Sequence, residues 1–233
     1  MRLSSSLFYR YLLVIICPAL AWACEVVSEP TPLQLPQPPD FLAMVVPADN
    51  PTTVEGVHLG RALFFDPILS VDSSVSCGTC HRPALAFTDG AAVSSGLNAR
   101  LGRRSAPSLL NIGFHYKAVF WDGRSESLED QALHPLSDTL EMGSDWSVVQ
   151  QRLLQNEDYQ QLFSAAFPQS GISRENTARA LAQFQRTLIS ADSKYDRVQR
   201  GVAEFTPAEK RGWTIFFDAG YPQTPMAECN HCH

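Results

Sequence analysis

The sequence predicts a mostly α-helical fold with long loops. Several segments repeat apolar residues at helical spacing, whereas the alternating patterns typical of β-strands are sparse. Two motifs of the form C-x-x-C-H also occur, at residues 77–81 and 229–233. The chain has 233 residues, 45% of them hydrophobic, which is enough for a sizeable core in one or two domains.

The first 23 residues have the features of an export signal. Arg2 and Arg10 precede an apolar run, and an Ala-x-Ala cleavage pattern ends at Ala23. The run is shorter than the roughly 20 residues that span a bilayer, so we expect a signal peptide at residues 1–23 rather than a membrane anchor. Cys24 leaves a lipid anchor open as an alternative. In both cases we expect the mature protein outside the cytoplasm, in the periplasm.

Two segments precede the first motif. Residues 24–50 are rich in proline and predict an extended leader rather than part of the core. Residues 53–65 repeat apolar side chains at helical spacing. Asp66 should end this helix, because a residue before proline, here Pro67, avoids the helical region. A short polar loop, residues 70–76, then leads into the first motif.

Two helical segments are expected in the middle of the chain. Residues 127–133 have the pattern of a short helix, which Pro135 should stop. Residues 147–167 predict one long amphipathic segment. Its expected apolar face consists of Val148, Val149, Leu153, Leu154, Tyr159, Leu162 and Phe163.

Capping signals mark the last two predicted helices. Ser173 is a suitable N-cap for a helix that extends to Ile189, with Leu181, Phe184 and Leu188 as its buried stripe. Thr206 and Glu209 form a capping box with proline between them, which predicts a further helix before the second motif. That helix carries Trp213, Ile215, Phe216 and Phe217.

The C-x-x-C-H pattern is the attachment motif for c-type haem. Two thiols at this spacing, Cys77 and Cys80, can bond to the two vinyl groups of a porphyrin, and His81 can then bind the iron as an axial ligand. A zinc ribbon is the alternative, but its cysteine pairs would lie about 15–20 residues apart, and these pairs are far more widely separated. We therefore expect two covalent haems in cytochrome c-like domains. The second motif offers the same three groups: Cys229, Cys232 and His233.

The charge and the C-terminus give two further expectations. The net charge is −6 and no basic run is present, so no nucleic-acid partner is expected. His233 is the last residue, and nothing follows it that would enclose a haem. An uncovered haem face would expose a large apolar patch, so we expect the second haem domain to be truncated in this sequence.

A series of short motifs follows in order after residue 50. They comprise residues 59–67 (LGRALFFDP), the first C-x-x-C-H, residues 86–90 (AFTDG), 106–111 (APSLLN), 120–124 (FWDGR), 127–129 (SLE), 131–132 (QA), 141–142 (EM), 186–189 (RTLI), 210–212 (KRG) and the second C-x-x-C-H. In this order the motifs strongly resemble those of the bacterial dihaem cytochrome c peroxidases.

The resemblance implies two cytochrome c-like domains. Residues 51–196 would form the N-terminal peroxidatic haem domain, and residues 197–233 would begin the C-terminal electron-transfer domain. An enzyme of this kind reduces hydrogen peroxide to water, and its second haem relays electrons from a small donor protein, a cytochrome c or a cupredoxin. The family includes relatives that use peroxide to oxidise tryptophan in a partner protein. Two alternative functions therefore stay open: oxidation of a partner protein, and electron transfer by a non-catalytic dihaem cytochrome. A homodimer is also open.

The resemblance also implies roles for residues outside the haem motifs. Trp121 matches a tryptophan that lies between the two haems, whereas Gln131, Pro135 and Glu141 match residues on the distal side of the peroxidatic haem. A carboxylate such as Glu141 can move a proton between the two peroxide oxygens, and Gln131 can only orient the peroxide. Taken singly, Trp121 fits core packing, Glu141 fits a surface carboxylate and Gln131 fits any helix face.

Two departures from the family pattern change the expectations. Many members carry a histidine in the loop after the AFTDG motif, which closes the peroxidatic iron until the enzyme is reduced, but residues 91–102 contain none. We therefore predict a peroxidatic haem with no protein sixth ligand. Ser105 replaces an asparagine that contributes to an interdomain calcium site, which weakens the case for calcium. Three arginines could pair either with haem propionates or with carboxylates on the protein surface: Arg103, Arg104 and Arg124.

Overall fold

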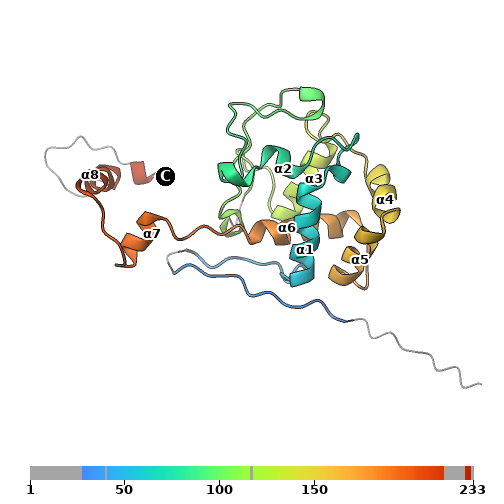
Figure 1. The fold of residues 1–233 in the computed structure, drawn as a ribbon, viewed down its shortest axis with the longest axis horizontal. Helices are drawn as coiled ribbons and strands as arrows, with labels where there is room; N and C mark the ends of the chain where they lie inside the picture. The colour runs from blue at the N-terminus through green and yellow to red at the C-terminus, as the bar shows by residue number, and fades with distance from the viewer. Residues whose placement is uncertain (1–27, 40, 116–117, 218–228, 232–233) are drawn as a thin grey trace, which may run out of the picture.

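The computed structural model describes residues 28–39, 41–115, 118–217 and 229–231. Within these residues the fold is mostly α-helical, as predicted, and β-structure is limited to isolated bridges. None of the described helices has the length and apolar character needed to cross a membrane. The helices shown in Figure 1 are α1 (Val54–Phe65), α2 (Cys77–Cys80), α3 (Leu128–Ser137), α4 (Trp146–Leu154), α5 (Glu157–Ala166), α6 (Arg174–Arg186), α7 (Lys194–Gln199) and α8 (Pro207–Phe216).

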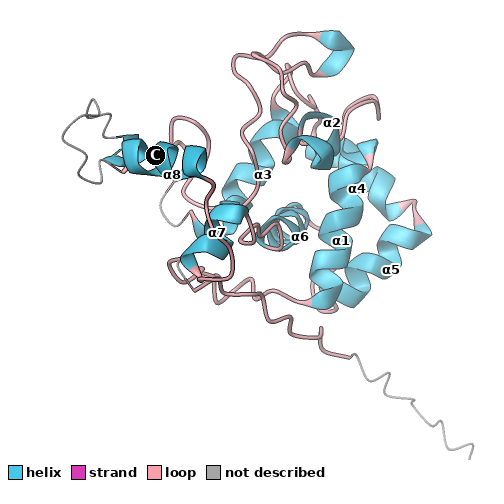
Figure 2. Ribbon diagram, turned by 60° about the vertical axis from the view of Figure 1, so that its left-hand side comes forward, coloured by secondary structure: helices cyan, strands magenta, loops and turns pink. Residues whose placement is uncertain are grey.

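Helix α6 is the centre of the core. It packs against α1 and α3, and Figure 2 shows it nearly end-on between them. Leu59, Leu63 and Phe64 of α1 are each at most 1% exposed. Gly60 lets the two helices approach closely, because a Cβ atom there would collide with the carbonyl oxygen of Ala180. The crossing of α1 and α6 thereby fixes the end of α1 that leads to the first haem motif.

Replacing Gly60 with alanine is expected to destabilise the protein by about 3 kcal/mol, because the new methyl group meets backbone that cannot move aside. Chemical denaturation of both proteins measures the change. Gly212 of α8 is a matched control, since a Cβ atom there would have no neighbour within 4 Å. Gly212→Ala should stabilise by about 0.5–1 kcal/mol through helix propensity alone. Equal effects at the two positions would contradict the close crossing.

The predicted capping residues are confirmed at two helices, α6 and α8, and the residues that begin two other predicted segments also act as caps. The Thr53 side chain accepts the Gly56 N–H at the start of α1. Ser127 caps α3 and Ser173 caps α6 in the same way. Thr206 and Glu209 form the expected capping box of α8. The two predicted caps, at Ser173 and Thr206, could be recognised from sequence because the partners lie within three residues of each other.

The prediction that Pro135 stops the third helix is wrong, since α3 continues to Ser137. Proline removes one backbone donor, but the final turn closes without it through the Asp138 N–H and the His134 carbonyl at 3.1 Å. Leu136 lies beyond the proline and is 7% exposed. Burial of this side chain favours the extra turn.

The predicted segment 147–167 is two helices, α4 and α5. The break lies at Gln155 and Asn156, and the Asn156 side chain caps α5 by accepting the Tyr159 N–H at 3.2 Å. As a consequence the expected apolar face is only partly buried. Val148 and Leu154 are 39% and 52% exposed, whereas the five other members are buried or half-buried. Helix α7 was not predicted, and α6 ends at Arg186 rather than Ile189.

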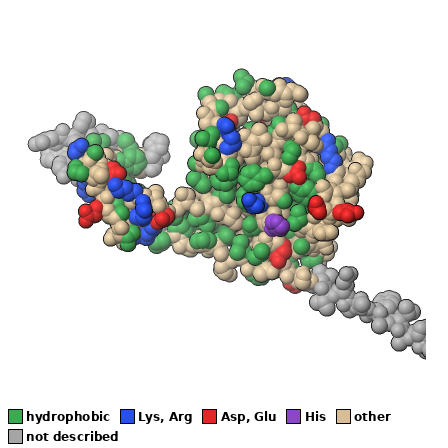
Figure 3. Space-filling view, in the orientation of Figure 1, with side chains coloured by type: hydrophobic (Ala, Val, Ile, Leu, Met, Phe, Trp, Pro, Cys, Tyr) green, Lys and Arg blue, Asp and Glu red, His purple; other side chains and the backbone are tan. Residues whose placement is uncertain are grey.

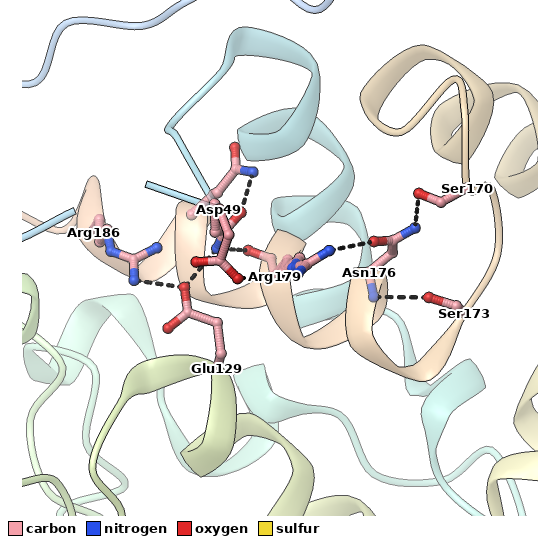
Figure 4. Close-up of polar contacts among 9 residues, drawn as sticks. Asp49, Glu129, Ser170, Ser173, Asn176, Arg179 and Arg186 are labelled. Atoms are coloured by element: carbon pink, nitrogen blue, oxygen red, sulfur yellow. Dashed lines mark hydrogen bonds and ion pairs between the residues drawn. The ribbon is translucent and has the colours of Figure 1, made fainter. Parts of the chain in front are cut away.

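The described part of the proline-rich segment, residues 28–39 and 41–50, contains no helix and is attached to the helical body. Its end, Asn50, is 2% exposed, donates to Glu129 at 2.5 Å and accepts from Gln183 at 2.8 Å. Glu129 also pairs with Arg186 at 2.6 Å, and Figure 4 shows these two side chains pointing towards each other from α3 and α6. A buried polar network therefore joins this segment to both helices.

Arg186 is 3% exposed, so its replacement by methionine leaves Glu129 without its cationic partner in the interior. The expected loss of stability is about 3–5 kcal/mol. Arg179, on the same helix, is the control, because its partner Asp49 is 73% exposed. Arg179→Met should cost about 1 kcal/mol or less. Thermal and denaturant unfolding of the two variants provide the comparison, and similar losses would contradict the importance of burial.

Candidate haem site

The loop before the first C-x-x-C-H motif is fixed from two directions. The Ser70 hydroxyl accepts the N–H groups of Ser74 and Val75 at 3.1 and 3.3 Å. The guanidinium of Arg152, on α4, donates to the carbonyls of three residues of the preceding turn: Ile68, Ser70 and Val71. The position of α2 is therefore set by a neighbouring helix as well as by α1.

His81 directly follows α2 and has the geometry of an axial ligand. Its Nδ1 atom lies 2.8 Å from the carbonyl oxygen of Phe87. A carbonyl can only accept, so a proton is on Nδ1, and Nε2 is the ring nitrogen left to bind an iron. Burial lowers the pKa of His81, which favours the neutral imidazole that a metal requires.

The two thiols of the motif are free. Cys77 and Cys80 form no disulfide. Burial raises the pKa of Cys77 to about 12, and burial also raises that of Cys80, with smaller contributions from the charges of Asp89 and Glu141. The Cys80 sulfur lies 3.7 Å from the Ser95 carbonyl, so the loop of residues 91–102 reaches the motif. Both cysteines are therefore free of a disulfide and available to bond to the vinyl groups of a haem.

A cavity of about 570 Å³ borders the motif on the side of Thr79 and Cys80. This volume is within the range of roughly 300–1,000 Å³ found for small-molecule sites. Among the described residues no cluster of three or more histidine, cysteine or acidic side chains could hold a bare metal ion. A neutral histidine, two free thiols and an adjacent cavity fit a covalent haem. The other cavity-lining residues are Asp72, Ser74, Val75, Arg82, Asp89, Ala91, Val93, Ser95, Gly96, Asn98 and Ala99.

Glu141 lies close to this motif. The Leu97 N–H donates to its carbonyl at 3.1 Å, and the Val71 N–H donates to the neighbouring carbonyl of Met142 at 2.9 Å. The side chain keeps exposed surface, yet desolvation by the surrounding protein, followed by the charge of Asp138, raises the pKa of Glu141. Its charge in turn raises the pKa of both motif thiols. The structure thus brings this predicted site residue into the electrostatic environment of the motif.

Trp121 is 62% exposed, so the alternative of core packing is wrong. Its indole N–H donates to the Ser105 carbonyl at 2.9 Å. The preceding residue, Phe120, is held between the Arg124 guanidinium, 3.4 Å from the ring centroid, and the His134 ring. Figure 3 shows hydrophobic side chains gathered on the flank of the body that faces α7 and α8. The tryptophan therefore lies on a surface loop, restrained by one hydrogen bond of its own and by the contacts of its neighbour.

The other predicted residues have mixed outcomes. Gln131 is half-buried on α3, and its side chain forms no hydrogen bond with a described residue. Arg104 and Arg124 form exposed ion pairs with Asp122 at 3.0 and 2.8 Å. Cys229 lies in a short 3₁₀ helix, Cys229–His231. The remaining two groups of the second motif, Cys232 and His233, lie outside the described residues.

Sequence reasoning missed the groups that contact the motif through their backbones. The Phe87 carbonyl accepts from His81, and the Ser95 carbonyl lies beside Cys80. Backbone atoms leave no signal in a residue pattern. Ser108 was also missed, although it lies in a quoted motif, because its hydroxyl contacts a residue 22 positions away.

The comparisons with known proteins agree with this geometry. The family model described as di-haem cytochrome c peroxidase matches residues 54–204. The methylamine utilization protein MauG of Methylophilus methylotrophus is 33% identical over 97% of this chain and 66% of its own length. Cytochrome c peroxidase Ccp of Escherichia coli is 36% identical over 81% of this chain and 39% of its own. The chain thus spans between about two fifths and two thirds of these relatives.

A solved structure gives the same result. The crystal structure of a MauG-like protein associated with microbial copper homeostasis aligns with a TM-score of 0.73 and 36% identity, covering 92% of this chain and 58% of that one. The chain therefore belongs to the di-haem cytochrome c peroxidase family, in which two c-type haems are the cofactors.

Proposed function

We propose that this chain is the N-terminal part of a periplasmic dihaem peroxidase that reduces hydrogen peroxide to water. Cys77 and Cys80 attach the peroxidatic haem, and His81 is its axial ligand. The observation that carries the proposal is the position of Glu141, a carboxylate with a raised pKa beside the haem motif. The electrons come from a small donor protein, a cytochrome c or a cupredoxin. Export through residues 1–23 supports the periplasmic location.

A haem held by Cys77, Cys80 and His81 would supply the iron chemistry that reduces peroxide. Glu141 accepts a proton from one peroxide oxygen and returns it to the other, which requires it to lie within about 2.6–3.2 Å of them. The amide of Gln131 holds the peroxide in one orientation. Each turnover takes two electrons and two protons and forms two molecules of water from one peroxide. His81 keeps its Nδ1 proton throughout, because that N–H donates a hydrogen bond to the Phe87 carbonyl.

Trp121 connects this site to the second haem in the proposed mechanism. Its indole is exposed, so a second domain could cover it, and its N–H donates to the Ser105 carbonyl, which restrains the ring. Cys229, Cys232 and His233 would hold the second haem, which would supply the site where electrons from the donor enter. A rigid aromatic ring between two cofactors can pass electrons without moving.

One observation favours a second function, the peroxide-driven oxidation of a partner protein. Residues 91–102 contain no histidine that could close the iron. In this case two electrons leave the partner's side chain, and peroxide is again reduced to two molecules of water. Both functions use the same site.

The test is peroxide turnover by the full-length, haem-loaded protein with reduced cytochrome c as donor. We expect steady oxidation of the donor that depends on peroxide, and its loss in the Cys77→Ala/Cys80→Ala variant. Oxidising equivalents that persist without donor and then modify an added partner protein would favour the second function. Two haems that are indifferent to peroxide would contradict both and indicate an electron carrier.

A further inference from the structure

The carbonyl that accepts from His81 belongs to an unusual turn. Ala86 and Phe87 both have positive φ, 55° and 58°, a left-handed conformation that costs energy in residues other than glycine. Such a turn persists only when its surroundings hold it. The turn orients the Phe87 carbonyl, which lies 2.8 Å from His81 Nδ1.

Ser108 holds this turn from outside the loop. Its hydroxyl donates to the Ala86 carbonyl at 2.6 Å, which is a short hydrogen bond. The Ala86 carbonyl and the Phe87 N–H belong to the same peptide unit. Holding that peptide unit in place therefore restrains the Phe87 backbone, and with it the direction in which the Phe87 carbonyl points at the imidazole.

Ser108 is exposed, but its backbone is well anchored. Leu109, the next residue, is 6% exposed. The Asn111 side chain donates to the Ser190 carbonyl at 2.9 Å and accepts the Ser190 N–H at 2.8 Å. The Asn111 N–H also donates to the Leu188 carbonyl at 2.7 Å. The hydroxyl of Ser108 is thus presented from a segment tied to the chain just beyond α6.

We propose that Ser108 is a positioning residue that sets the strength of the Phe87–His81 hydrogen bond and thereby the reduction potential of the N-terminal haem. A stronger bond from the Nδ1 proton makes the imidazole a better donor to iron, and a better donor favours the oxidised metal. The proposal rests on haem attachment at His81 and not on peroxide turnover. Its test is therefore independent of the proposed enzymatic function.

The experiment is a redox titration of the haem-loaded, full-length protein and its variants, combined with resonance Raman spectroscopy of the reduced state. Ser108→Ala should raise the potential of the N-terminal haem and lower its iron–histidine stretching frequency. The C-terminal haem should keep its potential and serves as an internal reference. Ser137→Ala is the matched control, because this exposed hydroxyl also donates to a carbonyl, that of His134 at 3.3 Å, but on α3.

Two further variants separate positioning from a general structural effect. Ser108→Thr keeps the hydroxyl and should retain the wild-type potential. Ala86→Gly, added to Ser108→Ala, should recover part of the shift, because glycine adopts the left-handed conformation without strain. An unchanged potential and stretching frequency in Ser108→Ala would overturn the proposal. If Ser108→Ala takes up no haem, a shifted potential in Ser108→Thr would overturn the proposal instead.

Discussion

Replacing Glu141 with glutamine is expected to lower peroxide turnover about 10²–10⁴-fold, the range that a positioned acid–base group supplies. Glutamine has nearly the same shape and can still bind peroxide, but it cannot accept a proton. The segment should keep its place, because its backbone bonds to Leu97 and Val71 do not involve the side chain. Haem content and the resting spectrum should therefore match the wild type, and stopped-flow mixing with peroxide measures the loss.

The pH profile gives a sharper result than the rate alone. Glu141 must be ionised to accept a proton, so turnover should fall as the pH drops through its pKa. That pKa is raised, chiefly by desolvation and further by Asp138. The acid limb of the pH profile, where turnover falls, should therefore lie at a pH above the ordinary pKa of a glutamate, about 4.3. Asp138→Asn should move the limb to lower pH, and Glu141→Gln should abolish it. Glu204→Gln is the control, since this exposed carboxylate lies outside the site. A profile that Glu141→Gln leaves unchanged would contradict the assignment.

The parts of the fold that sequence predicts are those determined by nearby residues. Ser173 and Thr206 cap helices through contacts three residues away, and the periodicity of residues 53–65 reports the face that α6 covers. The break at Asn156 was missed, because the apolar pattern continues across it. The turn beyond Pro135 was missed because burial of Leu136 compensates for one lost hydrogen bond.

In the candidate site, too, sequence predicts what depends on nearby residues and misses what depends on tertiary packing. The spacing of Cys77, Cys80 and His81 is a covalent requirement of the porphyrin, so sequence alone identifies it. The proximity of Glu141 to that motif depends on backbone bonds between loops far apart in the chain, and only the family resemblance indicated it. The exposure of Trp121 likewise depends on tertiary packing. A residue count does not distinguish a surface tryptophan from one in the core.

The N-terminal haem of the oxidised, full-length protein is expected to be high-spin at rest and to react with peroxide without prior reduction. The reason is the composition of the loop beside Cys80, where residues 91–102 contain no histidine although Ser95 and Ala91 come close to the motif and its cavity. Serine and alanine do not ligate haem iron, so His81 would be the only protein ligand on this iron. Electron paramagnetic resonance of the resting protein distinguishes the high-spin signal from the low-spin signal of the second haem.

Added imidazole and peroxide provide the two controls for this prediction. An open iron should bind imidazole and become low-spin, whereas an iron already held by two histidines should not change. Peroxide should abolish the high-spin signal at once in the oxidised protein, and a peroxidase with a closed iron should respond only after one electron has been supplied. A resting N-terminal haem with two histidine ligands would contradict the prediction. It would mean that a histidine outside residues 91–102, such as His115 or His134, reaches the iron once the haem is in place.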